Sequence, residues 1–395
     1  MVLNNFNQNY TQVQGRTLNM TAGIDLMPDF RIDLIADRLR TENYIEQYDV
    51  TDGYYFSRSP YTSGNYSIST ILIRTSFANN TDAFSETFET FKSNRLIIAN
   101  RLAEQYHGHK NFDVYDNPLD PVHAKNLGYP VGFGKNSQAV LIPAFLAAYS
   151  GSDASDYSTN TFKRFPLPNW TVKYSGLMKL NWFKDNFKRF SLHHGYKSTY
   201  AINSYRSNFE YDKNPGGTIA SSGDFIPKML IANMNLVEQF NPLIRVDFEL
   251  KNSYKFLAEM KKDRAMSLSF DNNLLTDVSG YEYIVGMGYR IKNVTINSRF
   301  AESTAGVIKN DINIRTDFSY RNNKTVIRYL DVLNNDRLSG GQNIWTVKFT
   351  ADYAFSKSLT TILFYDHSFS KAVISTAFPL TNIRAGFTIR YNFGN

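Results

Sequence analysis

The chain has 395 residues, of which 42% are hydrophobic and 20% charged, with 30 Phe and 26 Tyr. This composition excludes an intrinsically disordered chain, and no run reaches the roughly 18–20 consecutive apolar residues of a membrane-spanning helix. With no Cys, the chain has no disulfide, thiol nucleophile or thiolate metal site. The net charge of +7 is spread along the chain without runs of like charge, which argues against a nucleic-acid partner.

From the N-terminal end, apolar and polar residues alternate with period two. One run carries Leu18, Met20, Ala22, Ile24 and Leu26, and the next alternates Phe30, Ile32, Leu34 and Ala36 with charged residues. Such alternation predicts β-strands with one apolar and one polar face. Pro28-Asp29 is predicted as the tight turn between them, and residues 45–65 as a longer loop.

Residues 80–168 interrupt this pattern. Between residues 82 and 108 the apolar residues fall at helical spacing, and residues 139–149 form a second helix-like run. We therefore predict strands over residues 1–79, a helical insertion over 80–168 and strands over 169–395. The insertion cannot lie in lipid, so it belongs in the periplasm, at the cell surface or inside a wide lumen.

Alternation returns towards the C-terminus, where residues 345–355 and 382–393 are the best examples. Strands of ten or more residues match the roughly 9–11 that a tilted strand needs to cross a bilayer. Asn322-Asn323 and Ser356-Lys357 are predicted as turns. The fold predicted is all-β: an antiparallel transmembrane β-barrel segment of about 15 strands, part of a much larger barrel, with a helical insertion.

Seven charged residues fall on the polar side of the alternating runs and are candidates to face the lumen of such a barrel. They are Arg31, Asp33, Asp37, Lys348, Asp352, Arg384 and Arg390. They could be no more than a solvated barrel interior. Because both signs are present, such a lumen suits the passage of a polypeptide better than an ion-selective pore.

Motifs that could carry catalysis or bind a cofactor are weak. The pair His107 and His109 has no evident third metal ligand, and His193 and His194 point to opposite faces of one strand. The run from Gly132 to Lys135 lacks the full phosphate-loop pattern. We expect no cofactor, no metal site and no enzymatic activity.

Several segments together resemble one protein family. The most specific is residues 132–151, which includes Gly132, Gly134, Lys135, Gln138, Pro143 and Tyr149. Further matching segments are residues 93–104, 166–170, 190–200, 238–244, 323–328 and 348–353. Their order and number resemble the SprA (Sov) family, the outer-membrane translocon of the type 9 secretion system in Bacteroidota. Ala139 and Ser150 depart from the family pattern, which often has Asp and Thr there.

The resemblance implies a location and partners. Proteins of this family are very large outer-membrane barrels that export folded cargo proteins and serve gliding motility in some members. They work with a PorV-like barrel at a lateral opening and with a periplasmic plug protein. This chain would be the C-terminal portion, lying against outer-membrane lipid and pairing with the remaining strands of the same translocon, in the same or a separate chain. Residues 1–7 lack the basic and apolar regions of a signal peptide. Either a signal has been removed or the chain is part of a longer protein, and we favour the second.

Two other functions share part of this pattern. A small-solute transporter or porin-like barrel has the same strands but does not account for the helical insertion. A soluble, secreted β-rich binding protein could alternate in the same way, but its surface would not need so many aromatic residues.

Overall fold

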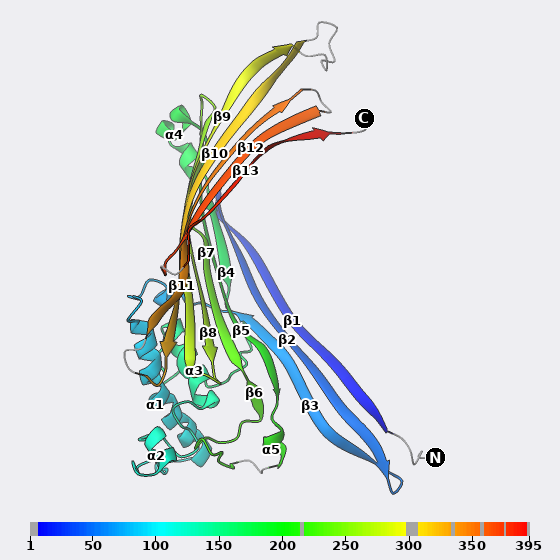
Figure 1. Ribbon diagram of the computed structural model, residues 1–395, viewed down its shortest axis with the longest axis vertical. Helices are drawn as coiled ribbons and strands as arrows, with labels where there is room; N and C mark the ends of the chain where they lie inside the picture. Colours follow the sequence, from blue (N-terminus) through cyan, green and yellow to red (C-terminus); the bar gives the residue numbers. More distant parts are fainter. Residues whose placement is uncertain are drawn as a thin grey trace.

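The computed structural model describes residues 7–213, 217–297, 307–332, 336–355, 359–374 and 377–392. Most of this chain forms one long antiparallel sheet (Figure 1). Its strands are β1 (Asn7–Met27), β2 (Phe30–Thr51), β3 (Tyr54–Ser69), β4 (Asn169–Tyr174), β5 (Phe187–Ser207), β6 (Met229–Ile231), β7 (Asn233–Leu250), β8 (Tyr254–Ser269), β9 (Leu274–Asn297), β10 (Val307–Tyr329), β11 (Arg337–Ala354), β12 (Leu359–Ala372) and β13 (Leu380–Tyr391). The all-β prediction is confirmed, with thirteen strands in the described residues.

The sheet is open. Its strand order is β1-β2-β3-β5-β7-β8-β9-β10-β11-β12-β13, with β4 pairing to β2 and β5, and β6 pairing to β5. Within the described residues, β1 pairs only with β2, and β13 only with β12. Both edge strands therefore leave one side of their backbone without a ladder partner.

Some predicted connections are confirmed and others are wrong. Pro28 and Asp29 do join β1 to β2, and Asp29 has the positive φ of 73° that such a turn requires. Residues 45–65 are instead mostly strand, because β2 and β3 meet in a short turn at residues 52–53. Residues 356–357 lie outside the described residues.

The predicted turn at Asn322-Asn323 lies inside β10. These amides bond across strands: Asn322 Nδ2 donates to Asn343 Oδ1 at 2.5 Å, and Asn323 Oδ1 accepts from the Gln342 backbone N–H at 2.7 Å. Neighbouring strands on both sides hold the backbone extended, so pairing overrides the local preference of Asn for turns.

Strand register gives the sheet two chemically distinct faces. On β11, Trp345, Val347 and Phe349 share one face, and Lys348 and Asp352 the other. Cross-strand pairing carries this division over the sheet: Val347 pairs with Phe318, which pairs with Val285, whereas Lys348 pairs with Asp317 and Asp366. We call these the apolar face and the polar face.

The helices are η1 (Ile73–Thr75), α1 (Glu86–His107), α2 (Pro121–Lys125), α3 (Gln138–Ser150), η2 (Gly176–Lys179), α4 (Asn181–Asn186) and α5 (Phe209–Lys213). The predicted helices at 82–108 and 139–149 correspond to α1 and α3. Ser85 caps α1 by accepting from the Phe88 N–H, and Gly108 ends it with φ of 75°. The strand region after residue 169 also contains η2, α4 and α5, which the sequence did not predict.

The insertion packs on the apolar face of the sheet. Phe91 of α1 and Phe145 of α3 are fully buried, with ring centroids 5.2 Å apart. Their core is continuous with strand residues of the apolar face, such as Tyr200, Met266 and Leu268. Figure 1 shows α1 and α4 on the side of the sheet opposite to that toward which the ends of β1–β3 and β9–β13 bend. One face of the same strands is thus covered by helices over part of its length and bare over the rest.

We expect Phe145→Ala to destabilise the insertion by about 3–5 kcal/mol, because it leaves a cavity in a fully buried aromatic cluster. Limited proteolysis and hydrogen exchange of α1 and α3 measure this. The matched control is Phe165→Ala, since Phe165 is 83% exposed. Equal protection of α1 in both variants would contradict the proposed core.

Candidate functional site

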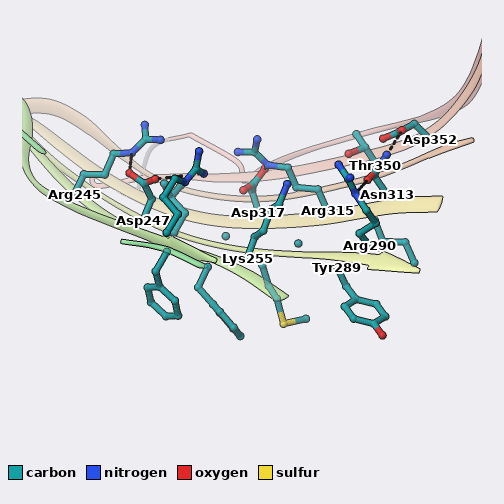
Figure 2. Close-up of a pocket in the computed structure, with 18 residues that line it drawn as sticks. Arg245, Asp247, Lys255, Tyr289, Arg290, Asn313, Arg315, Asp317, Thr350 and Asp352 are labelled. Atoms are coloured by element: carbon teal, nitrogen blue, oxygen red, sulfur yellow. Dashed lines mark hydrogen bonds and ion pairs between the residues drawn. The ribbon is translucent and has the colours of Figure 1, made fainter. Parts of the chain in front are cut away.

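A shallow groove of about 350 Å³ crosses the polar face over β7–β11. Figure 2 shows Arg245, Asp247, Arg315 and Asp317 on one side of the sheet, and Tyr289 on the other. The groove therefore lies on the charged side of strands whose opposite side is apolar.

Glycine makes room for the charged side chains in this groove. Gly286 lies on the polar face and pairs with Asp317 of β10. A Cβ at Gly286 would overlap the Asp317 carboxylate, whose Oδ2 accepts from Arg315 Nε at 2.7 Å. Glycine at residue 286 therefore allows the Asp317 side chain to pack closely against β9.

A continuous chain of ion pairs runs obliquely over the polar face, with alternating signs. Its links are Arg189–Asp247 (3.7 Å), Asp247–Arg245 (3.6 Å), Arg245–Glu259 (3.7 Å), Glu259–Lys261 (3.5 Å), Lys261–Glu282 (3.5 Å), Glu282–Arg321 (3.7 Å) and Arg321–Asp263 (2.9 Å). Most of these separations exceed hydrogen-bonding distance, and the arginines are partly exposed, so each pair contributes little stability. The chain instead makes the face wettable and close to electrically neutral.

Register places all seven predicted charged residues on the polar face. Near one edge, Arg31 Nε lies 2.9 Å from Asp33 Oδ1 on β2, the strand that also carries Asp37. Near the other edge, Arg384 of β13 pairs with Asp366 of β12 at 2.6 Å, and Asp366 is also the register partner of Lys348. The remaining two are Asp352, which accepts from Asn313 Nδ2 at 2.8 Å, and Arg390 on β13. The structure thus forms two groups, one on β2 and one over β11–β13.

The central residues of the ion-pair chain were not among the predicted site residues. Arg245, Asp247 and Glu249 alternate with apolar residues along β7, and Glu259 and Lys261 do so on β8. This period-two pattern of charged residues could have placed them on the polar face. The pairing between Glu282 and Arg321 could not be predicted from the sequence, because it depends on the register of β9 against β10.

The segment that carries the family resemblance attaches the insertion to the sheet. The Gln138 side chain bonds two backbone groups of β6, donating to Met229 O at 3.0 Å and accepting from Ile231 N at 2.9 Å. Lys135 Nζ lies 3.2 Å from Asp331 after β10. These contacts join α3 to elements far away in sequence.

Glycines in this segment allow a close approach. Gly132 has φ of 86°, and a Cβ there would overlap the ring of Phe225. The Gly134 backbone N–H donates to Asp224 Oδ1 at 2.8 Å, and burial raises the pKa of that carboxyl. The glycines therefore serve packing in this structure.

Pro143 and Tyr149 lie within α3 and are buried. The Tyr149 ring faces the Arg264 guanidinium at 5.1 Å, and burial raises the pKa of its phenol. Arg264 in turn forms an ion pair with Asp277 at 2.6 Å. α3 thus lies directly over a buried ion pair of β8 and β9.

The histidines form no metal centre in the part of the chain described. No group of three or more His, Cys, Asp or Glu side chains there could hold a metal ion. His193 Nε2 lies 3.1 Å from Asp247 on the polar face, whereas His194 Nδ1 lies 2.6 Å from Leu243 O and near Trp170. Among these residues, too, no helix has the length and hydropathy to cross a membrane.

Solved structures include one with a distant similarity to this chain. No protein-family model matches the chain, and no curated protein sequence matches it. A solved structure described as OmpT (in-vitro folded), an outer membrane protein of Vibrio cholerae in trimer form, aligns over 98% of this chain and 99% of its own. The sequence identity is 8% and the TM-score 0.23, so this similarity carries no argument about function.

We expect Gly286→Val to destabilise the β9–β10 pairing by about 1–3 kcal/mol, because the new side chain must displace Asp317. Hydrogen exchange of β9 and β10 amides measures this. Gly340→Val is the control, since the nearest atom to a Cβ there is 4.0 Å away. If the two variants exchange alike, the polar face does not need glycine at residue 286.

Proposed function

We propose that this chain forms part of the wall of an outer-membrane channel, as the C-terminal portion of a type 9 protein-secretion translocon that exports folded cargo. The observation that carries the proposal is that the same strands present a bare apolar face and an ion-paired polar face. Lipid on one side and water on the other is the environment that matches both.

The apolar face is exposed where the insertion does not cover it. Val285, Phe387 and Ile389 are 57%, 70% and 60% exposed. From Trp345 to Tyr353, the apolar run of β11 spans about the 9–11 residues that a tilted transmembrane strand needs. Aromatic residues at both ends of that run fit the two membrane interfaces. In water, so extended an apolar surface would cause aggregation.

The polar face supports passage of polypeptide. Its ion-pair chain alternates positive and negative groups, so it offers no strong field of one sign. A narrow selectivity site would need a ring of like charges. A cargo surface with mixed charges would meet neither strong attraction nor strong repulsion along this wall.

The open edges support a larger assembly. β1 offers 21 residues and β13 12 residues at the edges of the described sheet. Unpaired backbone groups in lipid cost several kcal/mol each, so we infer that further strands of the same translocon pair there. The expected PorV-like barrel, periplasmic plug and secreted cargo would act on that complete wall.

The insertion lies on the lipid side of this wall, beyond the bare apolar band. Its packing against the apolar face argues against the lumen as its location. The two longest connections, residues 70–168 and 208–228, both lie at this end of the strands, together with the short turns at 52–53 and 270–273. The turns at 28–29 and 251–253 and the connection that contains η2 and α4 lie at the other end. Because long connections of outer-membrane barrels are usually extracellular, we favour the cell surface over the periplasm.

Single cysteines in this Cys-free chain test the two faces. We expect Phe387→Cys to resist a membrane-impermeant thiol reagent and Thr388→Cys to react with it, because adjacent residues of β13 point to opposite faces. Labelling is measured on the native particle in membranes. Equal labelling of both positions would contradict a lipid boundary at β13.

Cross-linking tests what passes along the polar face. In cells in which a folded cargo protein is stalled during secretion, we expect Lys348→Cys to form a disulfide with a surface cysteine of the cargo, and Phe349→Cys on the opposite face not to. If neither position cross-links to cargo while the particle takes up small solutes, a small-solute transporter replaces the translocon.

A further inference from the structure

A row of aromatic side chains marks one end of the bare apolar band. Tyr283, Tyr320, Trp345 and Phe369 are register neighbours on β9–β12. Trp345 lies between two of these rings, with centroids 5.3 Å from Tyr320 and 5.5 Å from Phe369. Aromatic belts of this kind lie at the level of lipid head groups.

The next row on the same face is polar. Lys262 pairs with Tyr281, which pairs with Asn322, and that row continues to Asn343 and Lys371. The change from apolar to polar side chains within one pair of residues fixes the boundary of the apolar band. With the membrane placement given under Proposed function, the residues beyond this row on the same face lie outside the hydrocarbon.

A cavity of about 450 Å³ lies directly beyond this boundary, between the strands β8–β10 and the connection that follows η1. Four cationic side chains line it, against two carboxylates. The cations are Lys262, Arg264, Lys324 and Arg328, and the carboxylates are Asp82 and Asp277. Two further carboxylates lie beside the lining arginines, since Asp336 pairs with Arg328 and Glu238 is the register partner of Arg264. Four cations therefore face four carboxylates, and only Lys262 and Lys324 are left to hold an anion.

The two arginines are already held by carboxylates. Arg264 pairs with Asp277 at 2.6 Å, and Arg328 pairs with Asp336 at 2.6 Å. Both arginines are buried, and their carboxylate partners offset their charges. Their role in the cavity is electrostatic and does not require a change of partner.

Lys262 differs, because its charge is buried without a carboxylate. Lys262 is 6% exposed, and its Nζ donates to Ser76 O and lies 3.9 Å from the centre of the Phe77 ring. In the described chain, no carboxylate lies within ion-pair distance of it. The Glu238 carboxylate in the same region instead accepts from Ser76 Oγ and Tyr196 Oη. An uncompensated buried ammonium is costly and points to a missing anion.

Lys324 stands in the more accessible part of the cavity. Its Nζ lies 3.2 Å from Asp82, and the two side chains are 39% and 45% exposed. An ion pair this exposed contributes at most about 1 kcal/mol, so an incoming anion can replace Asp82 at little cost. Lys324 can therefore turn towards a ligand that enters from the bilayer side.

We propose that this cavity binds the anionic phosphorylated head group of a membrane lipid. Lys262 and Lys324 bind the phosphate, and the acyl chains lie along the bare apolar face, on the side of Trp345 away from the cavity. The site rests on the membrane placement given under Proposed function. The bound lipid lies between the aromatic row and the insertion and anchors the insertion at the membrane surface.

Native mass spectrometry of the purified particle in detergent tests the proposal, with phosphatidylglycerol, phosphatidylcholine or inorganic phosphate added. We expect retention of phosphatidylglycerol over phosphatidylcholine, and a loss of affinity of about fivefold for Lys324→Gln and for Lys262→Met. Lys371→Met is the control, because Lys371 lies in the same polar row but does not line the cavity. Lys262→Met removes a buried uncompensated charge, so it should not impair folding.

Equal retention of the two lipids, or unchanged retention in both lysine variants, would overturn the proposal. Binding of inorganic phosphate that competes fully with phosphatidylglycerol would also overturn it, in favour of a site for a soluble anion. The cysteine labelling of β13 is independent of these results. If Phe387→Cys is protected but no lipid selectivity is found, only the lipid site fails, whereas labelling of Phe387→Cys would remove the membrane placement itself.

Discussion

Each strand of this sheet must present apolar side chains on one face and charged side chains on the other, and this constraint determines the structure. Successive side chains of a strand point to opposite faces, so a period-two sequence makes each strand apolar on one side and charged on the other. The strand register then places apolar residues beside apolar residues and charged residues beside charged residues. Phe318 lies between Val285 and Val347, and Asp317 pairs with Lys348. A slip of one residue in any strand would expose charges to the apolar side, so this alternation also fixes the register.

The apolar face is used in two ways along the same strands. It is bare around Val285 and Phe318, whereas towards the other end of the strands Tyr200, Met266 and Leu268 are buried against α1 and α3. The change occurs at the Trp345 row, where the neighbouring Lys262 row supplies polar groups. A sheet longer than a bilayer is thick can therefore stand in lipid at one end and carry a water-exposed helical layer at the other. Attachment of that layer depends on side chains such as Gln138, which binds β6 through its amide.

Much of this was predictable because the signals are local. Alternation gave the strands and their two faces, and helical spacing of apolar residues gave α1 and α3. The misplaced turn at Asn322-Asn323 shows the limit, since the turn preference of Asn lost to pairing on both sides of β10. The ion-pair chain and the burial of Lys262 could not be predicted from the sequence, because they also depend on strand pairing and tertiary contacts. Glu282 meets Arg321, and Lys262 meets Ser76, only after residues far apart in sequence are placed side by side.

A cryo-EM map of the native particle that contains this chain would show whether the open sheet is part of a larger wall. We expect β1 and β13 each to pair with strands from outside these residues, so that the sheet is one arc of a larger wall with its polar face inward. A map in which β1 pairs with β13, and the chain closes alone around a narrow lumen, would contradict it.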